Sequence, residues 1–566
     1  MTFKFPNNII FICVLITGIS VVQAGSLPDK AAIASAHPLA TQAGMEILQQ
    51  GGNAFDAAVA VASTLAVVEP YSSGLGGGGF WLLHDEKSKR DVMIDGREKA
   101  PLKAHRDMYL DENKEVIQGL SLQGALAAGI PGVPAALDHI ARHYGQLPLK
   151  MSLAPAIRIA SQGFVIDETY RRFAQLRLKG LQADKETARI FLVNNEVPPV
   201  GYILKQPDLA QTLQIIANKG SKGFYQGSVA KQLLTGVKNG NGIWSQDDFN
   251  QYDIKERQPI SFSYHDYTVT SAAPPSSGGI ALATMLHILE EYDLQKLTAV
   301  SKKHLIVESM RRAYADRARY LGDTDFVTVP VKKLTSKKHA HQWRSSISMD
   351  KASKSQNLIP GKQAAPKGND TTHYSILDKQ GNRVAATLSI NYPFGACFVA
   401  PGTGVLLNDE MDDFSAKPGV PNAYGLVGAE ANAIQPGKRP LSSMSPTFIE
   451  SDKVLVIVGT PGGSRIITMV LHAILNSIDG MSALEVASAR RYHHQYLPDI
   501  ILYEQGALNE NEIKTLQALG HQLKDNTSPY GGQGDYGNMQ VVIWRKMSNA
   551  LEAASDPRGH GLAITK

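Results

Sequence analysis

The junction at residues 370–375, Asp-Thr-Thr-His-Tyr-Ser, is the feature that most constrains how this chain can fold. Residues 351–368 before it are rich in Lys, Gln, Ala, Pro and Gly and predict a loose segment. After it, apolar and β-branched residues predict two strands, at 374–377 and 384–390, joined by a short turn. A strand that begins at a capped turn would explain this pattern. The alternative is a bond that the chain cuts itself, which would make Thr371 a new N-terminus.

The second interpretation has a chemical basis. A threonine hydroxyl is a weak nucleophile at neutral pH and needs a base within hydrogen-bond reach. If the Asp370–Thr371 bond is cut, the freed α-amine of Thr371 lies beside its own hydroxyl, and an α-amino pKa near ~8 leaves a useful neutral fraction. In the intact chain the same hydroxyl can attack the preceding carbonyl and form an ester that water opens. One residue can therefore serve both maturation and turnover.

The N-terminus predicts export. Residues 1–4 form a short basic region, and residues 9–22 form an apolar run of signal-peptide length. A membrane anchor is the weaker alternative, because the run is short for a bilayer span and has no stop-transfer flank. We expect residues 1–24 to be a signal peptide that is cleaved after Ala24, which leaves no stable membrane span in the mature chain.

Size, charge and cysteine content narrow the class of protein. A chain of 566 residues exceeds a single minimal core, and its net charge of only +5 lacks the basic footprint of nucleic-acid binders. Of its two cysteines, Cys13 lies in the predicted signal, so Cys397 alone remains and no internal disulfide can form. The predicted fold must therefore be held by its core.

The predicted elements occur in blocks. Helices dominate residues 131–320, and strands, among them one at 404–407, dominate beyond the junction. Such blocks suggest stacked sheets covered by helices. The four glycines at 76–79 lack the Lys-Ser/Thr of a phosphate loop and predict tight backbone packing or a substrate-facing turn. The helix expected at 304–320 carries four arginines, which we interpret as a solvated and ion-paired face.

Seven motifs follow one another along the chain: residues 51–58 (GGNAFDAA), 74–79 (GLGGGG), 95–98 (DGRE), 371–375 (TTHYS), 408–414 (NDEMDDF), 439–447 (RPLSSMSPT) and 459–465 (GTPGGSR). In composition and order they resemble the motifs of the γ-glutamyltranspeptidases, which are N-terminal-nucleophile hydrolases. The resemblance extends from about residue 31 to 557, and as a set the motifs are highly specific.

The resemblance implies a fold and an activity. The fold is α+β, a four-layer αββα sandwich formed jointly by two autoprocessed subunits, residues 25–370 and 371–566. The activity is γ-glutamyl transfer from glutathione and other γ-glutamyl compounds to water, amino acids or dipeptides. It needs no cofactor and no metal, and it suits a periplasmic or secreted protein.

The resemblance also assigns roles to single residues, and the chemistry of a γ-glutamyl group agrees with them. The α-carboxylate needs a guanidinium and hydroxyl donors, the α-ammonium needs carboxylate and amide oxygens, and the oxyanion needs backbone N–H groups at a helix start. For the carboxylate the predicted ligands are Arg97, Ser442 and Ser443. For the ammonium they are Asp413, Glu410 and Asn391. For the oxyanion they are the backbone N–H groups of Gly462 and Gly463. Taken singly, each has a plainer explanation: a turn, a solvated acidic pair or the start of a helix.

Three positions deserve separate expectations. Ser389 stands where the family commonly has a second threonine hydroxyl near the nucleophile, and without the methyl its rotamer is less fixed. Glu410 stands where some members carry Gln, so it adds negative charge near the bound ammonium. Residues 417–434, which include Tyr424, resemble the lid that some bacterial members have over the glutamyl pocket. A lid favours a small γ-glutamyl substrate over a bulky acyl group.

Other functions remain open from the sequence. The same machinery could act on a dicarboxylic acyl amide, as in the related cephalosporin acylases, although Arg97 and the lid oppose this. An unprocessed binding protein that has lost catalysis is a further alternative. His493 and His494 invite a metal-site hypothesis, but no nearby residues have zinc-like spacing, so structural histidines are the better interpretation.

Overall fold

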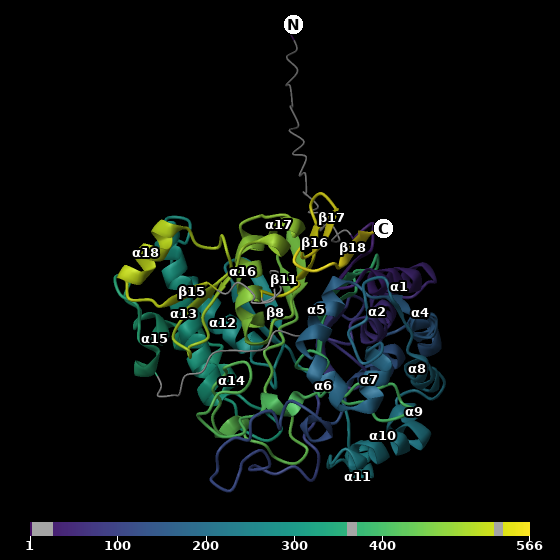
Figure 1. The fold of residues 1–566 in the computed structure, drawn as a ribbon. Coiled ribbons are helices and arrows are strands. Elements are labelled where there is room, and N and C mark those ends of the chain that lie inside the picture. Colours follow the sequence, from purple (N-terminus) through teal and green to yellow (C-terminus); the bar gives the residue numbers. More distant parts are fainter. Residues whose placement is uncertain (3–26, 359–370, 526–535) are drawn as a thin grey trace.

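Two antiparallel sheets lie face to face at the centre of the molecule, and helices cover both outer faces (Figure 1). The computed structural model describes residues 1–2, 27–358, 371–525 and 536–566. The first sheet has the order β18 (Leu562–Thr565), β1 (Ala32–Ser35), β9 (Thr372–Leu377), β10 (Arg383–Ser389), β2 (Gly78–Asp85), β3 (Arg90–Asp95) and β6 (Lys255–Arg257). The second has the order β17 (Ala550–Ser555), β16 (Gln540–Arg545), β12 (Val454–Gly459), β11 (Thr447–Glu450), β8 (Tyr267–Ser271) and β7 (Ile260–Tyr264).

Both predicted halves of the chain contribute strands to each sheet. In the first sheet β9 lies between β1, from residues before the junction, and β10, from residues after it. In the second sheet β11 pairs with β8 on one side and β12 on the other. The predicted αββα sandwich is therefore confirmed, and neither half could complete a sheet by itself.

Strand β9 shows why the sheets stack in this way. Its alternate residues Tyr374 and Ile376 join the core under the first helical layer. Ser375 and Leu377 point the other way, toward the second sheet. Ser375 Oγ donates to Gln540 O at 3.0 Å, and Leu377 joins the core between the sheets. Both faces of the strand are buried, as expected for an inner strand of two packed sheets.

The helices form two groups, one on each outer face of the sandwich (Figure 1). The first group is α1 (Pro38–Gln49), α2 (Ala54–Val68), α3 (Val133–His143), α4 (Leu149–Gln162), α5 (Glu168–Leu176), α6 (Leu178–Ala183), α7 (Lys185–Phe191), α8 (Pro207–Lys219), α9 (Lys222–Tyr225), α10 (Gly227–Asn239) and α11 (Gln246–Asn250). The second is α12 (Gly278–Leu289), α13 (Ala299–Tyr320), α14 (Val331–Leu334), α15 (Lys337–Arg344), α16 (Ile466–Ile478), α17 (Ala483–Ser488) and α18 (Glu510–Ala518). Short pairings outside the two sheets are β4 (Phe164–Val165) with β5 (Ile203–Leu204), and β13 (Tyr492–His493), β14 (Ile501–Tyr503) and β15 (Leu523–Asp525).

The glycine run lies where two backbones come very close. A Cβ on Gly76 would lie 2.0 Å from Leu406 O, and one on Gly77 would lie 2.2 Å from Ser389 O. Both distances are far below van der Waals contact, so any side chain here would push apart the strands that carry the site. The predicted tight backbone packing is therefore confirmed.

Two predictions about local structure are wrong. Residues 404–407 form no strand; Leu406 and Leu407 make only isolated bridges to Val399 and Gly76. The face of α13 is not solvated: Arg311, Arg312 and Arg317 are buried. The spacing from Glu308 to Arg312 does make an i,i+4 ion pair, so the charge pairing was visible in the sequence while the burial was not.

Some expectations lie outside the described residues. All but the first two residues of the predicted signal, residues 1–24, lie outside the described part, as do the end of the predicted loose segment and Asp370, which fall within 359–370. Among the helices of the described part, none combines the length and the apolar character needed to cross a bilayer.

Candidate active site

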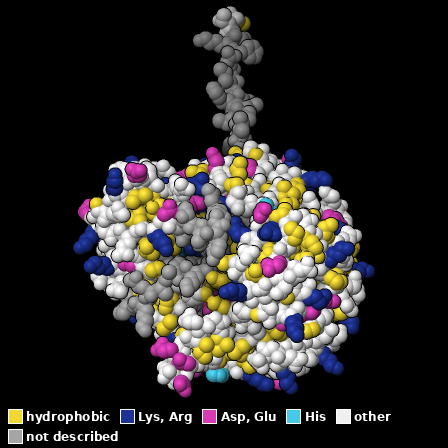
Figure 2. Space-filling model, viewed as in Figure 1, with side chains coloured by type: hydrophobic (Ala, Val, Ile, Leu, Met, Phe, Trp, Pro, Cys, Tyr) yellow, Lys and Arg dark blue, Asp and Glu magenta, His cyan; other side chains and the backbone are white. Residues whose placement is uncertain are grey.

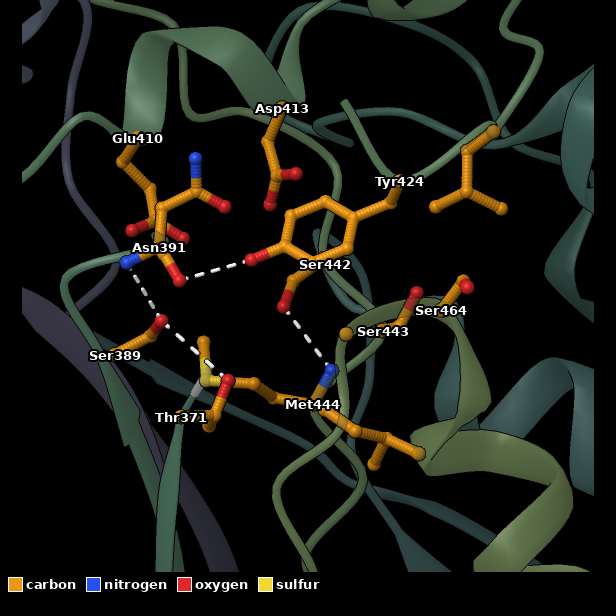
Figure 3. Close-up of a pocket in the computed structure, with 13 residues that line it drawn as sticks. Thr371, Ser389, Asn391, Glu410, Asp413, Tyr424, Ser442, Ser443, Met444 and Ser464 are labelled. Carbon is orange, nitrogen blue, oxygen red and sulfur yellow. Dashed lines mark hydrogen bonds between the residues drawn. The ribbon is translucent and has the colours of Figure 1, made fainter. Parts of the chain in front are cut away.

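Thr371 immediately precedes β9, an inner strand of the first sheet. Its side chain is buried, with a relative exposure of 5%. Thr371 Oγ1 donates to Ser389 Oγ at 3.5 Å, a long hydrogen bond, and Ser389 Oγ accepts a shorter one from Asn391 N at 2.8 Å (Figure 3). The neighbouring strands β9 and β10 therefore hold the threonine and its partner hydroxyl side by side.

Thr371 faces a small cavity lined mainly by polar side chains, with about 290 Å³ of empty space that includes its open mouth. The cavity is lined by Thr371, Ser389, Asn391, Glu410, Asp413, Tyr424, Leu426, Ser442, Ser443, Met444, Gly463, Ser464 and Ile466 (Figure 3). We call this cavity the glutamyl pocket. Most of the predicted site residues line it, although they come from six separate stretches of the chain.

Arg97 and Gly462 are the predicted site residues that do not line the glutamyl pocket. Arg97 is fully buried directly behind it, where its Nη1 donates to Glu410 and its Nη2 to Asp413. The guanidinium fork thereby fixes both carboxylates at the pocket wall. In this structure Arg97 orients the acidic groups rather than facing the cavity.

Glu410 is the wall residue best suited to bind a cation. Burial raises its pKa to about 7, and Arg97 beside it opposes that rise. Its Oε2 has no hydrogen-bond partner among the described residues, although Oε1 is held by Arg97. A buried carboxylate oxygen without a partner is costly unless a ligand supplies a donor, so an ammonium group fits this position.

The candidate oxyanion site is the start of the helix that follows β12. Gly463 begins the 3₁₀ turn η5 (Gly463–Arg465), which leads into α16, and its φ of +55° is a backbone conformation that favours glycine. Tyr314 on α13 donates from its hydroxyl to Ser464 O and fixes this turn. Backbone N–H groups at such a helix start are suited to an anion.

Ser442 and Ser443 lie on the wall opposite Asn391 (Figure 3). Ser442 N donates to Pro275 O at 2.8 Å, which ties this segment to the loop that precedes α12. Arg317 donates from Nη2 to Ser443 Oγ at 3.3 Å. Sequence reasoning missed Arg317, since only its position on a helix full of arginines was visible.

Tyr424 closes the pocket from the side of residues 417–434. Its hydroxyl donates to Asn391 O at 2.8 Å (Figure 3), and its backbone N–H donates to Asn422 Oδ1 at 3.0 Å. The segment is held at its base by a bridge between Ser415 and Ala433. Tyr424 therefore lines the pocket and connects the segment 417–434 to Asn391.

His493 and His494 point to different protein partners. His493 contacts Thr468 Oγ1 at 2.8 Å and Gln495 Oε1 at 2.9 Å, whereas His494 contacts Asp499 Oδ1 at 3.1 Å. Burial lowers the pKa of both rings. His493 thereby links α16 to Gln495, whereas the hydrogen bonds of His494 lie within the loop 494–499.

Comparisons with known proteins cover nearly the whole chain. The sequence profile of the family described as Gamma-glutamyltranspeptidase matches residues 40–565. The chain is 44% identical over 531 residues to the glutathione hydrolase proenzyme of Escherichia coli (strain K12), which covers 93% of this chain and 90% of that protein. The structure of cephalosporin acylase from Bacillus halodurans superposes with a TM-score of 0.83 at 25% identity. The match covers 100% of this chain and 98% of the acylase chain. Gamma-glutamyltranspeptidase of Helicobacter pylori gives a TM-score of 0.56 at 39% identity, over 58% of this chain and 94% of its own.

Proposed function

The chain belongs to the γ-glutamyltranspeptidase family, and we propose that it takes the γ-glutamyl group of glutathione onto Thr371 as an ester. Water resolves the ester in hydrolysis, and an amino acid or dipeptide resolves it in transfer. The protein is thus a γ-glutamyltransferase and glutathione hydrolase. Relatives named proenzymes support a precursor that is cut before Thr371.

One observation carries this proposal: Thr371 shares a small cavity with the buried carboxylate of Glu410, the half-buried carboxylate of Asp413 and two serine hydroxyls. A γ-glutamyl group presents an ammonium and a carboxylate at one end and an amide at the other. Asp413 and Glu410 suit the ammonium, and Ser442 and Ser443 suit the carboxylate. The amide end then reaches Thr371.

The reaction follows from what surrounds Thr371. Its free α-amine takes the proton from Oγ1, which attacks the amide carbonyl carbon. Backbone N–H groups at Gly462 and Gly463 stabilise the oxyanion. The C–N bond breaks as the amine returns the proton to the leaving nitrogen. In the second half, water or an amine attacks the ester, and Oγ1 leaves with the proton that the attacking group gives up. Ser389 holds Oγ1 in line between these steps.

Maturation and location belong to the same proposal. Residues 1–24 direct export to the periplasm or medium, and residues 25–370 and 371–566 form the large and small subunits. The shared sheets support stable association after cleavage, since separating the halves would expose strand edges and the cores on both sides.

The acylase alternative makes a different prediction about substrate. Glutaryl-p-nitroanilide lacks the α-ammonium of γ-glutamyl-p-nitroanilide, so it would leave Glu410 and Asp413 without a cationic partner. We expect kcat/KM to favour the γ-glutamyl compound by about 100-fold, because two charge-assisted contacts are lost. Release of p-nitroaniline from both compounds is followed in parallel. Faster turnover of the glutaryl compound would identify the protein as a dicarboxylic acyl amide acylase.

Donor binding should depend on pH through Glu410. Its pKa of about 7 means that the carboxylate forms as pH rises through neutrality. The ionised form attracts the substrate ammonium, so the donor KM should fall between pH 6 and pH 8 by several-fold. Glu410→Gln should flatten this dependence, because the amide does not titrate. An unchanged pH profile in the Gln variant would show that another group is responsible.

A further inference from the structure

Thr371 also lines a second cavity, which shares no other wall residue with the glutamyl pocket. This cavity has a volume of about 450 Å³ and lies between α5, the end of α2 and the loops that precede β16 and β18. Its lining includes Glu69, Tyr71, Arg172, Phe173 and His560. Met444, Ser442 and the acidic pair of the glutamyl pocket are not among its walls. The threonine therefore stands between two chemically different cavities.

We propose that this second cavity is the subsite for the leaving group and the acceptor, and that Arg172 binds their carboxylate while Glu69 receives their amine. The proposal rests on the proposed function and deepens it. An acyl group and a leaving group lie on opposite sides of the carbonyl that the nucleophile attacks. If the glutamyl part fills one cavity beside Thr371, the other part of the substrate must leave through the second.

Arg172 has the chemistry of a carboxylate anchor. Its guanidinium carbon lies 4.8 Å from the centroid of the Phe173 ring, and this stacking restrains the orientation of the guanidinium plane. Among the described residues no carboxylate pairs with it, in contrast to Arg558, whose guanidinium is fully committed to Glu504 and Asp556. A stacked arginine without an acidic partner, on the wall of a cavity, suits a dipeptide carboxylate.

His560 also lines this cavity, but an acidic side chain lies directly beside it. Its Nε2 lies 2.7 Å from Asp167 Oδ2, and the contact with Asp167 raises the pKa of the ring even though burial opposes that rise. The carboxylate of Asp167 thus faces the His560 ring at contact distance and offsets any positive charge that the ring carries. Arg172 consequently remains the main unpaired cation for an incoming carboxylate.

Glu69 has the position and chemistry for the amine. It is buried, with 3% relative exposure, and its Oε2 accepts from Thr372 Oγ1 at 2.7 Å, directly beside the nucleophile. An acceptor arrives as an ammonium and must lose a proton before its nitrogen can attack. Glu69 takes that proton; the nitrogen then bonds to the ester carbon, and the bond from that carbon to Thr371 Oγ1 breaks. The second proton passes through the α-amine of Thr371 to Oγ1.

The test compares two acceptors that differ only in the carboxylate. With γ-glutamyl-p-nitroanilide as donor, the mature enzyme is given glycylglycine or glycylglycinamide. Arg172→Gln should raise the KM for glycylglycine at least about tenfold, the effect of one charge-assisted hydrogen bond, and change that for the amide several-fold less. Arg319→Gln is the matched control, because Arg319 is exposed and lies over the adjacent Tyr320 ring at 5.0 Å. It should alter neither value.

A second variant tests the amine side. Glu69→Gln keeps an oxygen that can accept from Thr372, but it cannot take a proton, so transfer at saturating glycylglycine should fall by about 10²-fold. Equal effects of Arg172→Gln on both acceptors, or undiminished transfer in Glu69→Gln, would overturn the subsite. Failure of the proposed function looks different: the unmodified enzyme would then release no p-nitroaniline from the donor at all.

Discussion

Replacing Thr371 by alanine should leave a single uncut polypeptide without γ-glutamyl activity. The hydroxyl is required twice, once for the cut before residue 371 and once for the acyl-enzyme, so both fail together. We expect kcat/KM for γ-glutamyl-p-nitroanilide to fall by at least about 10⁴-fold, as for other lost nucleophiles. A denaturing gel should show one band in the variant and two in the unmodified protein, whose N-terminal sequences should begin at Gly25 and Thr371.

The neighbouring threonine provides the control for this experiment. Thr372→Ser keeps the hydroxyl that donates to Glu69 at 2.7 Å, and it should yield two bands. Two bands from Thr371→Ala would contradict the assignment of the cleavage site. One band from the unmodified protein, together with no activity, would favour the binding-protein alternative.

Replacing Arg97 by lysine should have the next largest effect. Lysine keeps the positive charge but not the planar fork that holds Glu410 and Asp413 at the same time. At least two charge-assisted hydrogen bonds are weakened, so kcat/KM for the donor should fall by about 100-fold or more. Because a cation remains in the buried cluster, the protein should still fold and still be cut into two subunits.

Arg439→Lys is the matched control. Arg439 is equally buried, but it lies near Asp95 and Asp325 rather than the glutamyl pocket. Kinetics and thermal unfolding are measured for both variants. We expect the Arg439 variant to lose stability without a specific loss of donor binding. A kcat/KM within threefold of the unmodified value for Arg97→Lys would show that the fork does not set the pocket.

Much of the site was predictable because its residues lie in short motifs. Thr371 was marked by its place between a loose segment and a strand. The family resemblance was confirmed by the match over residues 40–565. Local spacing and order were sufficient for these features.

The sequence alone thus determined the family, because its motifs are short and follow one another in the family's order. The resemblance then implied the sandwich and the set of residues around Thr371. The tertiary structure decided what those patterns cannot express. It placed Arg97 behind Glu410, a residue more than 300 positions away, and buried Arg317 where it reaches Ser443. It also brought Arg172 into a cavity beside Thr371. Such contacts arise from the packing of two sheets and two helical layers, and no spacing along the chain encodes them.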